Sequence, residues 1–176
     1  MHSFKVFFSL LFYFIFLLQS VTNADQSLFY IDMKYVMANS LAGKQISKQL
    51  NDLNSKNFKD FKRIEENIKL KEKKIIAQKN VIDQNEYNMR VSEIQNQIKD
   101  YKNLVIIKKK EISNKESKAT MELLKYVNKI LVDYSDEKKI SLILAKRNVI
   151  IGKKELEITS EILTLVNNKV KKIDLN

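Results

Sequence analysis

The side chains of this sequence that could do chemistry are almost entirely lysines and carboxylates. Its 32 lysine and arginine residues stand against 21 acidic ones, a formal net charge of +11, with no cysteine and a single histidine, His2. Histidine is the commonest general base and metal ligand, and cysteine supplies thiolate nucleophiles. The sequence also has no glycine-rich phosphate loop and no G-x-S-x-G turn. We therefore expect no enzyme, no metal site and no cofactor.

Basic residues gather on both sides of a predicted turn at residues 83–86. There they could attract acidic polypeptide or anionic lipid head groups. The candidate contacts for a bound protein or a lipid surface are Lys69, Lys73, Lys74, Lys79 and Arg90, with the aromatic Phe58, which lies off the apolar seam of its helix. Charge runs are more often solvated helix faces, and these charges are spread along the chain. Both interpretations stay open.

The first 24 residues have the order of a secretory signal peptide. Met1–Lys5 carries one positive charge, Val6–Leu18 is almost wholly apolar, and small residues precede Asp25. The apolar run is shorter than the roughly 20 residues that span a bilayer. We expect export and cleavage after Ala24. Retention as a membrane anchor stays an alternative, because no charge interrupts the sequence between the first lysine and Asp25.

The elements that must position these side chains are long helices. With two glycines and no proline in 176 residues, the chain has few turns. The predicted elements are a strand over 25–32, a first long helix over 33–82, a tip at 83–86 and a second long helix over 87–135. Apolar residues in both helices recur three or four apart, the coiled-coil period, and the second seam includes Leu123, Tyr126 and Ile130. Two such seams predict a long antiparallel, coiled-coil-like helical hairpin, in a fold that is mainly α.

Residues 140–152 hold two short apolar runs that predict a strand pair. Thr159 fits the N-cap of a closing helix over 160–170. Together with the strand at 25–32, the pair would form a small β body, too small to stand alone with open edges. We therefore expect a homo-oligomer that closes the sheet. The residues expected in its oligomer core are Phe29, Ile31, Leu142, Leu144, Val149 and Ile151.

Two stretches carry a resemblance to a known family. They are Phe29–Met33, leading into the first helix, and Ile140–Leu165, which contains E-I-T at the start of the closing helix. With the order of elements, they resemble the Skp/OmpH family of periplasmic chaperones. Two departures are Glu157, where members carry aspartate in D-I-T, and Ala145, where members often carry aspartate. The resemblance implies that residues 25–176 form a chaperone domain of this family.

The same resemblance implies a trimer with a β-barrel body and three helical arms. Such a trimer holds unfolded outer-membrane β-barrel proteins in the periplasm without ATP. The expected partners are therefore these unfolded proteins and further copies of the chain, with an anionic lipid surface as a possible third.

Two other functions are compatible with parts of the sequence. A membrane-anchored coiled-coil adaptor or structural protein of the envelope would retain Val6–Leu18 as its anchor. A nucleic-acid-binding protein is suggested by the pI of about 9.6. An export signal, dispersed charge and the lack of a recognition module argue against nucleic acid as a partner.

Overall fold

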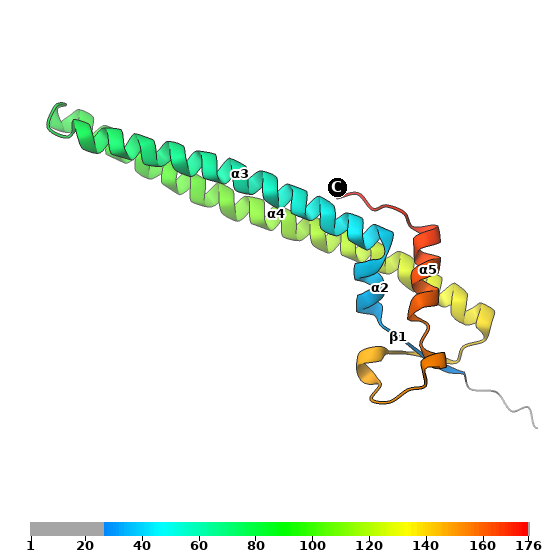
Figure 1. The fold of residues 1–176 in the computed structure, drawn as a ribbon. Helices are drawn as coiled ribbons and strands as arrows, with labels where there is room; N and C mark the ends of the chain where they lie inside the picture. The colour runs from blue at the N-terminus through cyan, green and yellow to red at the C-terminus, as the bar shows by residue number, and fades with distance from the viewer. Residues whose placement is uncertain (1–26, 176) are drawn as a thin grey trace, which may run out of the picture.

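The computed structural model describes residues 27–175, which form a long helical hairpin extending from a small body (Figure 1). The elements are β1 (Leu28–Ile31), α2 (Met33–Asn39), α3 (Leu41–Gln78), α4 (Gln84–Lys138), β2 (Leu142–Ala145), 3-10 segments at Lys146–Asn148 and Lys154–Leu156, and α5 (Thr159–Lys169). The predicted class, a mainly α fold with a long antiparallel hairpin and a small β element, is confirmed. The signal peptide predicted at 1–24 lies outside the described residues. Within 27–175, no helix has an apolar stretch long enough to cross a bilayer.

The turn at the far end of the hairpin is fixed by Asp83. Its carboxylate accepts hydrogen bonds from the backbone N–H groups of Asn85 and Glu86, at 2.9 and 3.0 Å, and so caps α4. Residues 84–86 are therefore already the first turn of α4. The tip lies at 79–83, a few residues before the predicted 83–86.

The first long helix is interrupted at Ser40, so the prediction of one helix over 33–82 was wrong at this point. Ser40 has an extended backbone (φ −61°, ψ 154°), and its hydroxyl oxygen accepts a hydrogen bond from the N–H of Gly43 at 3.1 Å. A serine side chain can thus cap a new helix where apolar spacing alone suggests continuity. Gly43 permits the sharp junction, because a Cβ there would lie 1.8 Å from the carbonyl oxygen of Met37.

The β body consists of two short strands in parallel. β1 pairs with β2, with Leu28 opposite Leu142 and Ile31 opposite Ala145. The strand pair predicted over 140–152 is not formed: β2 is its only strand in the described structure, and residues 146–148 turn as a 3-10 segment. Within residues 27–175, the run at 149–151 pairs with neither strand: the 3-10 turn leads it away from β2, and on its other side β1 meets Glu157 in a parallel bridge at Tyr30.

The core lies where α2 and α5 meet the base of the hairpin. Its fully buried side chains include Val36, Leu123, Val127, Ile162 and Val166. The hydroxyl of Thr159, predicted as an N-cap, instead accepts a hydrogen bond from the N–H of Asp32 at 2.9 Å, so α5 is tied to the β1–α2 junction. In the outer part of the arm, only Ile68 and Ile94 are buried among the described residues. The body is therefore well packed, and the arm is a thin pair of helices.

Candidate functional site

One face of α3 brings together several of the sequence-predicted contact residues. Phe58, Lys69, Lys73 and Ile76 are separated by 11, 4 and 3 positions, which are close to whole helical turns. They therefore share an exposed face, which lies beside the seam in which Ile68 is buried. Phe58 and Ile76 are each 68% exposed, and both lysines are exposed. We call these four residues the outward face of α3.

The remaining predicted basic residues lie in two different settings. Lys74 and Lys79 are exposed, and Lys74 is one turn along α3 from Leu70, which is 60% exposed. Arg90, by contrast, donates hydrogen bonds to Gln78 at the end of α3 and to Glu86 in its own helix. Its guanidinium therefore links α3 to α4 near the tip of the hairpin. The sequence did not indicate this structural role.

A second apolar face, on α4, was missed by sequence reasoning. Met89, Ile107, Met121 and Val132 are separated by 18, 14 and 11 positions, again close to whole turns, and each is more than half exposed. The signal was present, since these residues fall between the seam positions of α4. We call them the outward face of α4. Methionine side chains are flexible and adapt to irregular partners.

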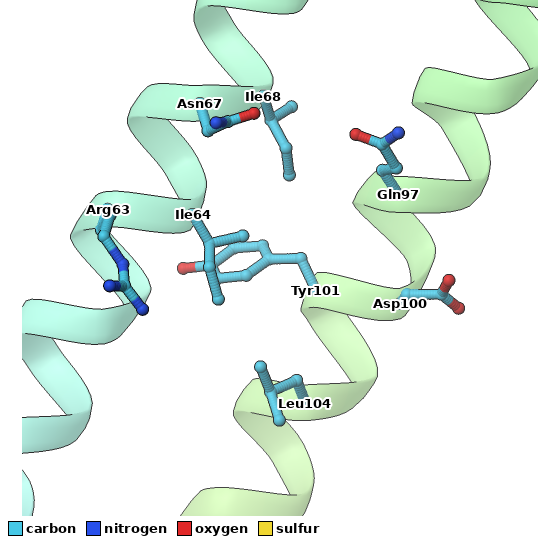
Figure 2. Close-up of a pocket in the computed structure, with 8 residues that line it drawn as sticks. All are labelled: Arg63, Ile64, Asn67, Ile68, Gln97, Asp100, Tyr101 and Leu104. Atoms are coloured by element: carbon cyan, nitrogen blue, oxygen red, sulfur yellow. The ribbon is translucent and has the colours of Figure 1, made fainter.

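A notch of about 540 Å³ opens between the two helices midway along the arm (Figure 2). Figure 2 shows Tyr101 extending from α4 toward Ile64 of α3. The ring of Tyr101 meets that of Phe61 edge to face, with centroids 6.1 Å apart. Its hydroxyl donates a hydrogen bond to the carboxylate of Glu65, which together with partial burial raises the pKa of Tyr101 to about 12. These contacts hold α3 and α4 together at the notch. Within residues 27–175, no cluster of potential metal ligands occurs there or elsewhere.

The residues expected in an oligomer core divide between the inside and the surface of one chain. Ile31 is 4% exposed and belongs to the chain's own core. Leu142 and Ile151 are 50% and 92% exposed, and the neighbouring Ile150 is 98% exposed. The half-buried members are Phe29, Leu144 and Val149. A groove of about 1020 Å³ runs between β2 and the end of α4.

An ion pair joins the loop after β2 to the start of α5. The ammonium of Lys146 lies 2.7 Å from the carboxylate of Glu157, which also accepts a hydrogen bond from the hydroxyl of Thr159 at 3.0 Å. The hydrogen bond from Lys146, followed by that from Thr159, lowers the pKa of Glu157, and the same pairing raises the pKa of Lys146. This contact fixes the base of the 146–157 loop, where Ile150 and Ile151 are presented.

Comparison with known proteins places this architecture in context. Residues 27–166 match the family model described as outer membrane protein (OmpH-like). A crystal structure described as that of an OmpH-like outer membrane chaperone, from Caulobacter crescentus, superposes with a TM-score of 0.81 at 16% sequence identity, over 85% of this chain and 89% of that chain. At that identity the likeness shows a shared fold. A search of curated proteins finds no match.

Proposed function

This chain belongs to the OmpH-like outer membrane protein family, and from that membership we propose that it is an ATP-independent holdase chaperone. Its clients would be unfolded outer-membrane β-barrel proteins, kept from aggregating during transit through the periplasm. The signal peptide expected at 1–24 would deliver it there. A chaperone role is what the family supports; the holding mechanism and the clients are our proposal.

The observation that carries the proposal is the exposure of apolar side chains along both helices of the arm. Phe58 and Ile76 on α3, with Met121 and Val132 on α4, are all more than half exposed. Apolar side chains repeated along one face are a common mark of a binding surface. An unfolded β-barrel protein offers alternating apolar residues along its whole length. Such a client could touch these faces at many points.

Release without ATP requires that each contact be weak. Two rows of separate apolar side chains meet this requirement, because avidity comes from their number rather than from one tight pocket. Lys69 and Lys73 lie between Phe58 and Ile76 on the outward face of α3. These lysines would attract acidic clients, or anionic lipid head groups, in a manner that weakens with salt.

We also propose that the working form is a homo-oligomer, a trimer by the family resemblance. Within residues 27–175 the sheet has two strands, and the nearby Ile150 and Ile151 are almost completely exposed. Pairing the 149–151 run with a strand edge of a neighbouring copy would cover both side chains. Sedimentation velocity should then give three times the mass of one chain, and a monomeric mass would contradict this part of the proposal.

Complex formation with a client tests the proposed function. A denatured outer-membrane β-barrel protein is diluted into ATP-free buffer with the exported chain, centrifuged, and passed through a size-exclusion column. We expect soluble client that elutes together with the chain. The control is the same client already folded in detergent micelles, which should elute alone. Client found only in the pellet would refute the holdase.

A further inference from the structure

The segment 170–175, which we call the strap, leaves α5 and lies along the base of α3 (Figure 1). Its first residue, Val170, has an extended backbone (φ −127°, ψ 98°). Lys171 and Lys172 are both exposed, and from Ile173 on the burial alternates as in a β-strand: Ile173 is 3% exposed, Asp174 is exposed and Leu175 is half-buried. The strap lies beyond the residues 27–166 that match the family.

Glutamine side chains of α3 bind the backbone of the strap. The amide of Gln49 donates to the carbonyl of Ile173 at 2.9 Å and accepts from the N–H of Leu175 at 3.4 Å. One residue of a neighbouring parallel β-strand would make this same pair of bonds. Gln45 accepts from the N–H of Ile173 at 3.0 Å. Two side chains one turn apart on α3 thus take the place of a strand edge.

The other wall of the site comes from α4. The ammonium of Lys115 donates to the carbonyl of Leu175 at 3.0 Å. One turn further along α4, Ala119 belongs with Ile46 to the buried cluster that includes Ile173. The strap therefore lies in a groove with an apolar floor and a rim of hydrogen-bonding side chains.

These hydrogen bonds recognise backbone and not sequence. All four join Gln45, Gln49 or Lys115 to peptide N–H or C=O groups. Other extended chains carry the same groups, and a β-barrel strand alternates apolar and polar residues as Ile173, Asp174 and Leu175 do. The groove therefore has the chemistry to accept segments other than the strap.

We propose that this groove is a second binding site for extended apolar segments of an unfolded client, and that the strap occupies it in cis until such a segment displaces it. The proposal rests on the proposed holdase function for the identity of the competing segment. At the base of the hairpin, a client segment would be bound through its backbone hydrogen-bonding groups, as by a neighbouring strand. The outward faces of α3 and α4 offer apolar and charged side chains instead. The strap is suited to exchange, because Ile173 is the one side chain beyond Val170 that it buries fully.

The probe is a fluorescein-labelled synthetic peptide that copies residues 168–176, followed by anisotropy with the full chain. Ile173→Asp frees the groove by placing a carboxylate in its apolar floor. Lys171→Asp, at an exposed position of the same strap, is the matched control. We expect the freed groove to bind the peptide roughly tenfold or more tightly than wild type or control, because apparent affinity scales with the fraction of open grooves. Adding Gln49→Ala should remove most of that gain.

Equal binding by Ile173→Asp and wild type, with the helical content of the variant intact by circular dichroism, would overturn the proposal. Should the variant fail to fold, hydrogen exchange on the wild-type chain decides. Excess peptide should speed exchange at the N–H groups of Ile173 and Leu175, and unchanged exchange would overturn the proposal. Peptide binding by the wild-type chain that weakens as protein concentration rises would assign the groove to the strap of a second copy, also against a cis strap.

The same variants separate this inference from the proposed function. Wild type that keeps a client soluble, without tighter peptide binding by Ile173→Asp, refutes the groove and leaves the holdase intact. Tighter peptide binding by Ile173→Asp, without any soluble client complex in wild type, supports the groove as a site for extended peptide and refutes the holdase.

Discussion

Gly43 of α3 lies against the carbonyl oxygen of Met37 in α2, where a Cβ would stand 1.8 Å from that oxygen. Backbone atoms cannot move aside as a flexible side chain does, so Gly43→Ala must shift α2 relative to α3. We expect a loss of about 1–3 kcal/mol in the free energy of unfolding, the range for overpacking a tight site. Urea denaturation measures it, with the exposed Lys44→Ala as control. Equal midpoints for the two variants would contradict this account of the junction.

The contact between Tyr101 and Glu65 predicts an unusual titration. Since the carboxylate of Glu65 accepts a hydrogen bond from the phenol hydroxyl, the neutral phenol is favoured and the pKa of Tyr101 is raised to about 12. A raised pKa contributes stability that is complete below the ordinary value of 10.0 and is lost as the pH rises toward 12. Ultraviolet absorbance, with Tyr101→Phe subtracted, follows the phenolate. Glu65→Gln should lower this pKa toward its ordinary value, and an unchanged titration would show that the carboxylate is not its cause.

The Lys146–Glu157 ion pair predicts sensitivity to acid. The pKa of Glu157 is lowered, first by Lys146 and then by Thr159, so the pair contributes stability above the ordinary value of 4.5 and loses it as the pH falls below. The midpoint temperature of thermal unfolding should therefore fall more steeply below that pH for wild type than for Glu157→Gln. The difference will be small because the pair is partly exposed to solvent. Glu155→Gln, exposed in the same loop, should follow wild type, and three parallel curves would argue against the pair.

Export predicts a defined start of the mature chain. If the first 24 residues are a cleaved signal peptide, protein purified from the periplasm begins at Asp25. N-terminal sequencing of that protein is the measurement. A chain in the membrane fraction that still begins at Met1 would favour the anchored adaptor instead.

Much of the fold follows from residue spacing. The apolar seams predict the hairpin because a helix that buries one face must repeat apolar residues every three or four positions. The spacing of Asp83 and Glu86 marks the start of α4 because an aspartate that caps a helix accepts its first free N–H groups. Both signals are local, so they can be recognised without the tertiary structure.

The predictions fail where tertiary contacts determine which residue is buried or where a helix breaks. The seam was expected to include Tyr126, but Val127 is fully buried and Tyr126 is 46% exposed, because packing against α5 selects the neighbouring position. The break at Ser40 depends on the close approach of Met37 to Gly43, which spacing cannot show. The groove under the strap was also missed, because glutamines carry no distinctive sequence signal and their partners lie more than 100 positions away.

The exposure of the candidate contact residues could be predicted in part, while their role stays a prediction. Phe58 is exposed as expected, because it lies off the seam of a two-helix arm. Arg90 could not be distinguished from the other basic residues, since its partner Gln78 becomes a neighbour only when the hairpin closes. The outward face of α4 was overlooked because its members are far apart in the sequence.

Light scattering tests the central claim that exposed apolar side chains of the arms hold an unfolded client. A denatured outer-membrane β-barrel protein is diluted into ATP-free buffer with an excess of wild type, of Phe58→Asp/Ile76→Asp, or of the control Ser55→Asp/Asn80→Asp, which adds the same charge at exposed positions of α3 and the tip. We expect suppressed scattering with wild type and control. The double variant should need roughly tenfold more protein, because losing two apolar contacts costs about 1–2 kcal/mol in binding. Undiminished scattering with wild type, or equal suppression by all three proteins, would contradict the account.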